Sequence, residues 1–456
     1  MVAGRDEVLE LLDGVLRQAS GRRAEALYFG QDSALTRFAT NRIHQNVREH
    51  DASVQVRIVE DDDRVGVAST NRLDVGGIRD VVARATAIAS RSAPNPRAAV
   101  LPEPDGREAD PELGYVPATA EAGAELRAEG ARAVIAAGQA KGLQTSGSFS
   151  TSVTTIAVAN SLGIRAFHRS TRAGLLTVMM DGFASGAASG YAHGGAADVT
   201  AIDAEGLGLE AAGKGDRMRG ATAPEPGEYE VILEEYAVAG LLEYLSYIGF
   251  SGLAYEEGRS FMELGKRVMG ENVRIWDDGA DPAGLPSTVD FEGVTRKRVE
   301  LITDGVATGV AHDAATGARS GTGSTGHALP APNLVGPMPL NVFMAGGSVP
   351  REELVARIAR GVWVTRFHYI NPVHPKKAIL TGMTKDGTFL IEDGRITRPL
   401  MNFRFTQSIP EAFSDVRAAS RETKLLPGEF FGAYSAPALH LGSFNFTGVT
   451  AAEGTE

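Results

Sequence analysis

The sequence predicts an α+β protein whose C-terminal half is mostly β-structure. Helical apolar spacing occurs near the N-terminus and again in the middle of the chain, whereas short apolar runs between glycine and aspartate turns dominate after residue 227. The chain has 456 residues, 43% of them hydrophobic and 22% charged, so it can bury a substantial core. Its 54 glycines follow no G-X-Y period and indicate many tight turns.

The N-terminal region, residues 1–92, is expected to be a small α/β unit of the α+β type. Apolar residues at helical spacing predict a helix over residues 5–20. A second helix is predicted from Asp74, which suits an N-cap, to about residue 90. The strands of a mostly antiparallel sheet are predicted at 26–29, 34–39, 54–59 and 65–68.

The middle of the chain is predicted to contain helices and a long β-hairpin. Residues 93–118 are proline-rich and predict an extended linker to a middle region, residues 119–222. The elements predicted in that region are a helix over 119–140, hairpin strands over 143–160 and 164–180, a flexible loop over 182–197 and a helix over 198–213.

The C-terminal domain is expected to span residues 227–450 and to be followed by a polar tail, residues 451–456. A strand at 228–233 leads into a helix at about 235–248. Further strands are predicted at 294–303, 306–310, 340–344, 361–370, 376–380, 387–392, 399–406 and 437–448. Dense short strands favour a sandwich or barrel-like domain over a doubly wound sheet.

Composition excludes several classes of function. The formal charge of −12 argues against a general nucleic-acid-binding surface, which needs clustered Lys and Arg. The absence of cysteine excludes disulfides, thiolate nucleophiles and Cys-ligated metals in this chain. Because no apolar signal region and no membrane-spanning stretch is present, we expect a cytoplasmic protein that does not contact the membrane.

The familiar catalytic motifs are missing or lie in the wrong context. No two of the nine histidines lie three to five residues apart, so no helix can present a zinc-binding pair. Residues 321–326 match GxGxxG, but the flanking sequence does not predict the strand and helix that a dinucleotide site needs. Ser324 and His327 could form a nucleophile–base pair, although polar neighbours in a Gly-rich loop are usually turn residues.

Four segments together resemble the TldD/PmbA family of metallopeptidase proteins. They are residues 36–46 (TRFATNRIHQN), 64–74 (RVGVASTNRLD), 291–297 (FEGVTRK) and 324–328 (STGHA). They occur in the family's order across roughly residues 25–450. No single segment is decisive, but the set is specific.

The resemblance implies that this chain lacks the family's metal site. Catalytic TldD subunits carry HExxxH on the helix after the first strand of the C-terminal domain, and the resemblance places Glu243, Tyr244 and Ile248 at the three motif positions. A tyrosine cannot serve as the general base for a metal-bound water, and isoleucine cannot bind a metal. The resemblance therefore implies no catalytic and no metal-binding residue here, which is the pattern of TldE (PmbA) subunits, and leaves the substrate-binding residues unassigned.

The resemblance further implies a noncatalytic subunit of a cytoplasmic TldD–TldE-type complex that cleaves unfolded or precursor peptides. The expected partner is a TldD-like catalytic subunit, in a heterodimer or higher assembly, and the expected zinc or similar divalent metal lies in that partner. This chain would bind no cofactor and would contribute chamber wall and peptide-holding surface. Strand edges of its C-terminal domain could hold an extended peptide, and the Gly-rich loop 317–326 would admit a neighbouring backbone.

Two alternatives remain open from the sequence. The chain could be a metallopeptidase in its own right, with an atypical metal site built from Glu234, Glu235 or Glu243 and a remote histidine. It could also be a self-associating peptide-binding or scaffold protein that works without a TldD-like partner. Metal analysis and peptide cleavage distinguish the first alternative, and capture of partners from native cells distinguishes the second.

Overall fold

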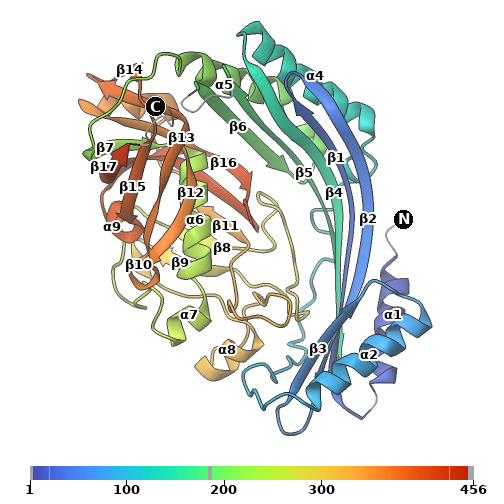
Figure 1. Ribbon diagram of the computed structural model, residues 1–456. Helices are drawn as coiled ribbons and strands as arrows, with labels where there is room; N and C mark the ends of the chain where they lie inside the picture. Colours follow the sequence, from blue (N-terminus) through green and yellow to red (C-terminus); the bar gives the residue numbers. More distant parts are fainter. Residues whose placement is uncertain (1–3, 20, 183–186, 431, 450–456) are drawn as a thin grey trace, which may run out of the picture.

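The computed structural model describes residues 4–19, 21–182, 187–430 and 432–449. A long six-stranded sheet curves along one side of the molecule, and the C-terminal domain lies against its inner face (Figure 1). The protein is therefore an α+β protein rich in β-structure, as the sequence predicts.

The six-stranded sheet is entirely antiparallel and has the order β3-β2-β1-β4-β5-β6. Its strands are β1 (Arg23–Ala39), β2 (Arg42–Val59), β3 (Val65–Thr70), β4 (Gln144–Asn160), β5 (Arg165–Met180) and β6 (Ser189–Ala196). Strand β4 of the hairpin β4–β5 pairs with β1 from Glu25 to Phe38. The N-terminal and middle regions thus build one sheet together.

Three expectations for this sheet were wrong. The predicted strand 54–59 is only the end of β2, which begins at Arg42 and pairs with β1 from there on. The predicted strands 26–29 and 34–39 are one strand, because the polar residues between them stay in register, and Asp32 forms an ion pair with Arg48 across the strand pair. The predicted loop 182–197 contains strand β6, while 183–186 lie outside the described residues. Glycine is required within β6: a Cβ on Gly190 would lie 2.1 Å from a carbonyl oxygen of the adjacent helix.

Four helices cover the outer face of the sheet (Figure 1). They are α1 (Arg5–Gln18), α2 (Val75–Ala89), α4 (Ala124–Ala140) and α5 (Ala204–Arg217). Asp74 caps α2 by accepting a hydrogen bond from Gly77 N at 2.8 Å, as predicted. Helix α5 begins later than the expected residue 198, because Asp203 caps it by accepting from Gly206 N. The remaining short elements here are α3 (Pro117–Ala120) and the 3₁₀ turn η1 (Val199–Ala201).

The C-terminal domain contains a closed barrel, which confirms the barrel-like prediction. Strand β7 (Gly227–Leu233) pairs in parallel with β12 and antiparallel with β17, so the ring β7-β12-β13-β15-β17 closes. The other ring strands are β12 (Arg360–His374), β13 (Ile379–Glu392), β15 (Phe403–Ser408) and β17 (Ala433–Val449). Strands attached to the ring are β8 (Ile275–Asp277), β9 (Val299–Thr303), β10 (Val306–Ala307), β11 (Asn341–Met344), β14 (Arg395–Pro399) and β16 (Val416–Pro427).

The strand predictions in this domain were wrong at several boundaries. Residues 376–380 and 387–392 belong to one strand, because Asp386, at φ 57°, forms a bulge and not a hairpin turn. The predicted strand 399–406 is divided between β14 and β15, and of 294–303 only β9 is a strand. Strands β8 and β16 were not predicted.

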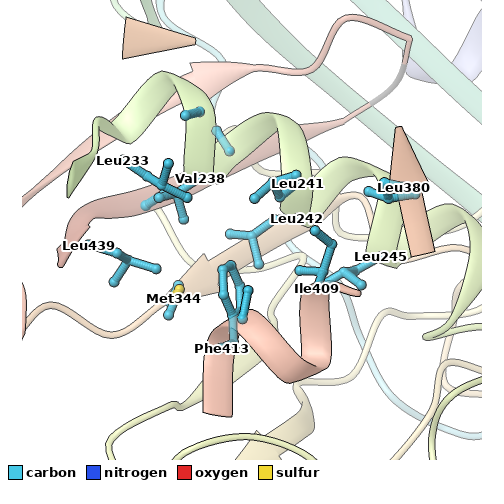
Figure 2. Close-up of a cluster of buried hydrophobic side chains, with 14 of the residues drawn as sticks. Leu233, Val238, Leu241, Leu242, Leu245, Met344, Leu380, Ile409, Phe413 and Leu439 are labelled. Atoms are coloured by element: carbon cyan, nitrogen blue, oxygen red, sulfur yellow. The ribbon is translucent and has the colours of Figure 1, made fainter. Parts of the chain in front are cut away.

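The C-terminal core surrounds helix α6 (Glu235–Ile248), whose predicted bounds are confirmed. Figure 2 shows Val238, Leu241, Leu242 and Leu245 of this helix among side chains of the barrel and of α9. The remaining helices are α7 (Gly252–Glu256), α8 (Ala314–Ser320), α9 (Ile409–Ser414) and the 3₁₀ turns η2 (Arg351–Glu353), η3 (Val355–Arg357) and η4 (Pro375–Lys377). Among the described helices, none has the length and hydropathy needed to cross a membrane.

Candidate functional site

Helix α6 carries the positions at which the sequence predicts a lost metal site. One face of the helix packs into the barrel core (Figure 2), and the other lines a cavity of about 80 Å³ beneath strand β6. Tyr191 and His193 of β6, Arg366 of β12 and Glu243 of α6 all line this cavity. The helix therefore lies at the contact between the six-stranded sheet and the barrel.

Glu243 holds the backbone of the loop that precedes β17. Its carboxylate is buried and accepts hydrogen bonds from Glu429 N at 2.9 Å and from Phe430 N at 2.8 Å. A carboxylate that receives two N–H groups is well solvated by the protein. The side chain that the resemblance places at the motif's first histidine position thus acts as a structural acceptor.

The other two motif positions are also occupied by structural contacts. Tyr244 donates its hydroxyl hydrogen to Ile370 O at 2.5 Å, and its ring meets Phe430 edge to face. Burial, with the charges of Glu429 and Glu243, raises the pKa of the Tyr244 phenol, so it stays protonated at neutral pH. Ile248 is buried in the core. Neither side chain can accept a proton from a metal-bound water.

Glu234, at the N-cap of α6, is the centre of a buried ion network. Lys214 of α5 approaches its carboxylate at 2.7 Å and Arg351 at 3.0 Å. Trp363 Nε1 and Thr365 Oγ1 donate hydrogen bonds to it as well. Burial opposes its ionisation, but the two cations lower the pKa of Glu234. The carboxylate is therefore ionised, and it contacts two cations and two hydrogen-bond donors.

Glu235 shares the guanidinium of Arg351, at 2.8 Å. Burial raises the pKa of the Glu235 carboxyl, against the charge of Arg351. Glu234 and Glu235, two of the three glutamates considered for an atypical metal site, are thus each paired with a cation. Glu243, the third, is held by backbone N–H groups.

A second part of the network joins α5 to strand β16. Glu210 pairs with Lys214 at 2.7 Å and with Lys424 at 3.0 Å. Although burial disfavours its charged form, the two lysines lower the pKa of Glu210 to about 2. Tyr236 Oη donates to Glu210 at 3.0 Å and accepts from His193 N at 3.3 Å. Burial lowers the pKa of His193 to about 4, so this imidazole is neutral at pH 7.

Within the described ranges, no three His, Asp or Glu side chains are grouped so that they could hold a metal ion. The pairing of Ser324 with His327 is not formed. Ser324 Oγ donates to His312 O, whereas His327 contacts Thr325 Oγ1 at 2.9 Å and Asp277 Oδ1 at 2.7 Å. Because His327 and Asp277 are both fully buried, substrate cannot reach this trio.

The GxGxxG segment ends a helix and does not begin one. Gly321 terminates α8 in the left-handed conformation, at φ 75°. A Cβ on Gly317 would lie 2.3 Å from Gly323 C, and one on Gly326 would lie 2.7 Å from Arg296 Cα. The Gly-rich loop therefore admits close backbone contacts from within this chain.

Two of the four segments that carry the family resemblance lie against each other. Phe291 N donates to Ala328 O, and Asp290 Oδ2 accepts from Ala328 N at 2.9 Å. Arg296 Nε donates to Gly326 O at 3.0 Å. Segments 291–297 and 324–328 thus form one packed unit.

Sequence reasoning missed the cations of the network, Lys214, Arg351 and Lys424. Each lies in a segment whose pattern is ordinary for a surface. The signal that could have indicated them is the pair Glu234-Glu235 directly after a buried strand, because buried carboxylates need partners. Trp363 is buried in the core and also donates to Glu234.

Comparisons with known proteins agree with this architecture. Residues 226–448 match the model of the PmbA/TldA metallopeptidase C-terminal domain, and residues 24–89 match that of PmbA/TldA metallopeptidase domain 1. An uncharacterized protein of Methanocaldococcus jannaschii is 33% identical over 101 residues, which cover 22% of this chain and 24% of that protein. The chain therefore spans about a quarter of that relative's length.

Three solved structures share the fold over nearly the whole chain. TldE from Thermococcus kodakarensis is 20% identical, with a TM-score of 0.86 over 97% of this chain and 100% of that one. A protein of Thermotoga maritima, titled a candidate modulator of DNA gyrase, is 17% identical, with a TM-score of 0.83 over 96% and 99%. A protein of Bacteroides thetaiotaomicron with a similar title is 18% identical, with a TM-score of 0.82 over 98% and 100%.

Proposed function

This chain belongs to the PmbA/TldD family of metallopeptidase proteins, and on that premise we propose that it is the noncatalytic, TldE-like subunit of a peptidase complex. The metal of that complex, zinc or a similar divalent ion, is held by a TldD-like partner. This chain supplies chamber wall and a surface that holds unfolded or precursor peptides. It works in the cytoplasm.

The main support for the proposal comes from the contacts that the side chains of helix α6 make. At the three positions of the family's metal motif, Glu243 binds a loop backbone, Tyr244 binds a backbone carbonyl and Ile248 lies in the core. The neighbouring Glu234 and Glu235 are paired with cations. The helix keeps its place in the fold while its side chains hold neighbouring segments together, which suits a subunit that supports a catalytic partner.

An exposed apolar surface beside α6 supports a partner contact. Tyr369 and Val373 of β12 are 70% and 57% exposed, and Tyr247 of α6 is 47% exposed. Tyr369 has a positive φ of 49°, a strained conformation for an aromatic residue, at a bulge of β12. Ile370, its neighbour, accepts the hydroxyl of Tyr244. We place the TldD-like partner on this surface, defined here by Tyr247, Tyr369 and Val373.

Co-expression with a TldD-like protein of the same cell tests the proposal. The expected result is a stable complex that cleaves unfolded peptides, whereas each subunit alone cleaves them far more slowly. Chelator-sensitive cleavage by this chain alone would instead favour the atypical metallopeptidase. Recovery of self-assembled copies alone from native cells would favour the scaffold.

A further inference from the structure

A cavity of about 610 Å³ lies between the six-stranded sheet and the C-terminal domain. Alternate residues of β1, β2, β4 and β5 line one wall, because residues two apart face the same side of a sheet. Loops near residues 285–296 and 329–340, together with Phe430 and Gly432, line the other wall. The cavity is distinct from the small one beside α6.

Two arginines face each other across this cavity. Arg172 comes from β5, where it lies opposite Ser152 of β4, and Arg296 comes from the packed unit of segments 291–297 and 324–328. Burial, and then the charge of Arg296, lowers the pKa of Arg172. The two positive charges repel each other, and an anion bound between them would offset that repulsion.

Neither arginine has a carboxylate partner in the described part of the chain. Arg296 is 6% exposed, and although its Nε donates to Gly326 O, its Nη1 is buried without a hydrogen-bond acceptor. Arg172 likewise forms no ion pair or hydrogen bond with a described residue. A buried guanidinium atom without an acceptor costs free energy, so it marks a place where an acceptor from outside the chain would fit.

Asp277 and Asp290, two acids on which the charge of Arg296 acts, have other hydrogen-bond partners. Asp277 accepts from His327 Nε2 and from the backbone N–H groups of Leu340 and Asn341. Asp290 accepts from three backbone N–H groups, including that of Ala328 at 2.9 Å. Both carboxylates are buried, and neither hydrogen-bonds to a guanidinium.

The rest of the lining suits a peptide. Ser152, Thr154 and Ser170 present hydroxyl groups on the strand face beside Arg172. Phe29 and Phe291, whose ring centroids are 6.5 Å apart, provide an apolar region. Hydroxyls can bind main-chain amides, aromatic rings can pack on apolar side chains, and a guanidinium pair can bind a carboxylate in bidentate fashion.

We propose that this cavity binds the free carboxylate end of an apolar peptide between Arg172 and Arg296. The proposal rests on the peptide-holding role proposed above and names the group that is held. Glu243 connects the two sites, because the loop that it binds carries Phe430 to the rim of the cavity. Inorganic phosphate shares the oxyanion chemistry, and so it serves as the competing probe.

Calorimetric titration of the purified full chain tests this. The probes are an N-acetylated hexapeptide of Ala, Leu and Phe with a free C-terminal carboxylate, the same peptide as a C-terminal amide, and inorganic phosphate. The carboxylate peptide should bind roughly 10- to 100-fold more tightly than the amide, as expected for bonds to a charged group. Arg172→Gln should remove that preference.

Arg165→Gln is the matched control, because it removes one positive charge from an exposed position of the same strand. It should keep the preference for the carboxylate. Equal binding of both peptides, or an unchanged preference in Arg172→Gln, would overturn the proposal, and so would binding of phosphate without binding of the peptide. Because the titration needs no partner subunit, its failure would leave the proposed complex standing.

Discussion

Glu243 shows how one side chain can keep a position in a fold while its chemistry changes. The resemblance places it at the first position of the family's metal motif, and its carboxylate accepts hydrogen bonds from Glu429 N and Phe430 N. Glu243→Gln should lower the free energy of unfolding by about 1–3 kcal/mol, because one charge-assisted acceptor is lost in a buried place. Urea denaturation of both proteins measures this.

The control for that substitution is Glu263→Gln. Glu263 is exposed and pairs with Lys266, three residues away, so its loss should leave the urea curve almost unchanged. Equal effects of the two substitutions would contradict the structural role of Glu243.

His168 makes stability depend on pH at the junction of the two sheets. Its Nε2 donates to Pro286 O, and burial lowers the pKa of its imidazole to about 4. In the unfolded chain the ordinary pKa of 6.5 applies, so between pH 6.5 and 4 the unfolded state binds more protons. Stability should therefore fall across this window as pH falls, by about 3 kcal/mol from this group at pH 4.

The variant His168→Gln should flatten that part of the pH profile, measured as the free energy of unfolding at pH 7, 5.5 and 4. His50→Gln, at an exposed position of β2, should leave the profile as it is. Unchanged pH dependence in His168→Gln would show that other groups cause it.

The sequence shows which residue occupies each position, but it does not show which residues that side chain contacts. The absence of a histidine pair and the occupants of the motif positions can be stated from the sequence alone. The contacts of Glu243 cannot, because they join residues that are 186 and 187 positions apart. Arg172 and Arg296 could not be identified as a pair from the sequence, because it does not show that β5 and loop 291–297 line the same cavity.

Among the elements, helix α5 is joined to the barrel by buried ion pairs. Lys214 contacts Glu210 and Glu234 at 2.7 Å each and is largely buried. Lys214→Met should lower the free energy of unfolding by about 3–5 kcal/mol, since it leaves buried carboxylate charge short of a partner. Urea denaturation measures this loss. Amide hydrogen exchange of the variant should increase most over Ala204–Arg217.

Lys141→Met is the matched control for this helix. Lys141 pairs with Asp216 of α5 at 3.0 Å, but both side chains are substantially exposed, so its loss should destabilise the protein much less than the loss of Lys214. If Lys214→Met costs no more than Lys141→Met, the network does not hold α5 to the barrel.

Helices were predicted more accurately than strands, for a physical reason. Helix α6 has its own apolar spacing and a glycine at its end, so its bounds follow from local sequence. Strand β6 consists of small residues whose pairing with β5 and contact with α5 are set by distant segments. The closure of the barrel by β7 and β17 depends equally on contacts far apart in the chain.

For the whole molecule, the surface of Tyr247, Tyr369 and Val373 should govern assembly. The double variant Tyr369→Ser/Val373→Ser should weaken binding to the TldD-like partner by about tenfold or more, because exposed aromatic anchors dominate interfaces. Its stability alone should change little. Val75→Ser, at an 81% exposed apolar position on the outer face, should leave binding unchanged. Undiminished binding by the double variant would place the partner elsewhere.

The central claim is that the hydrolytic metal of this family is not held by α6 of this chain. The most direct measurement is the divalent metal content of the purified chain, without a partner, after dialysis against metal-free buffer. We predict far less than one equivalent of metal per chain, with no difference between the native protein and Glu243→Gln. One tightly held equivalent that is lost in Glu243→Gln, together with chelator-sensitive peptide cleavage, would contradict the account.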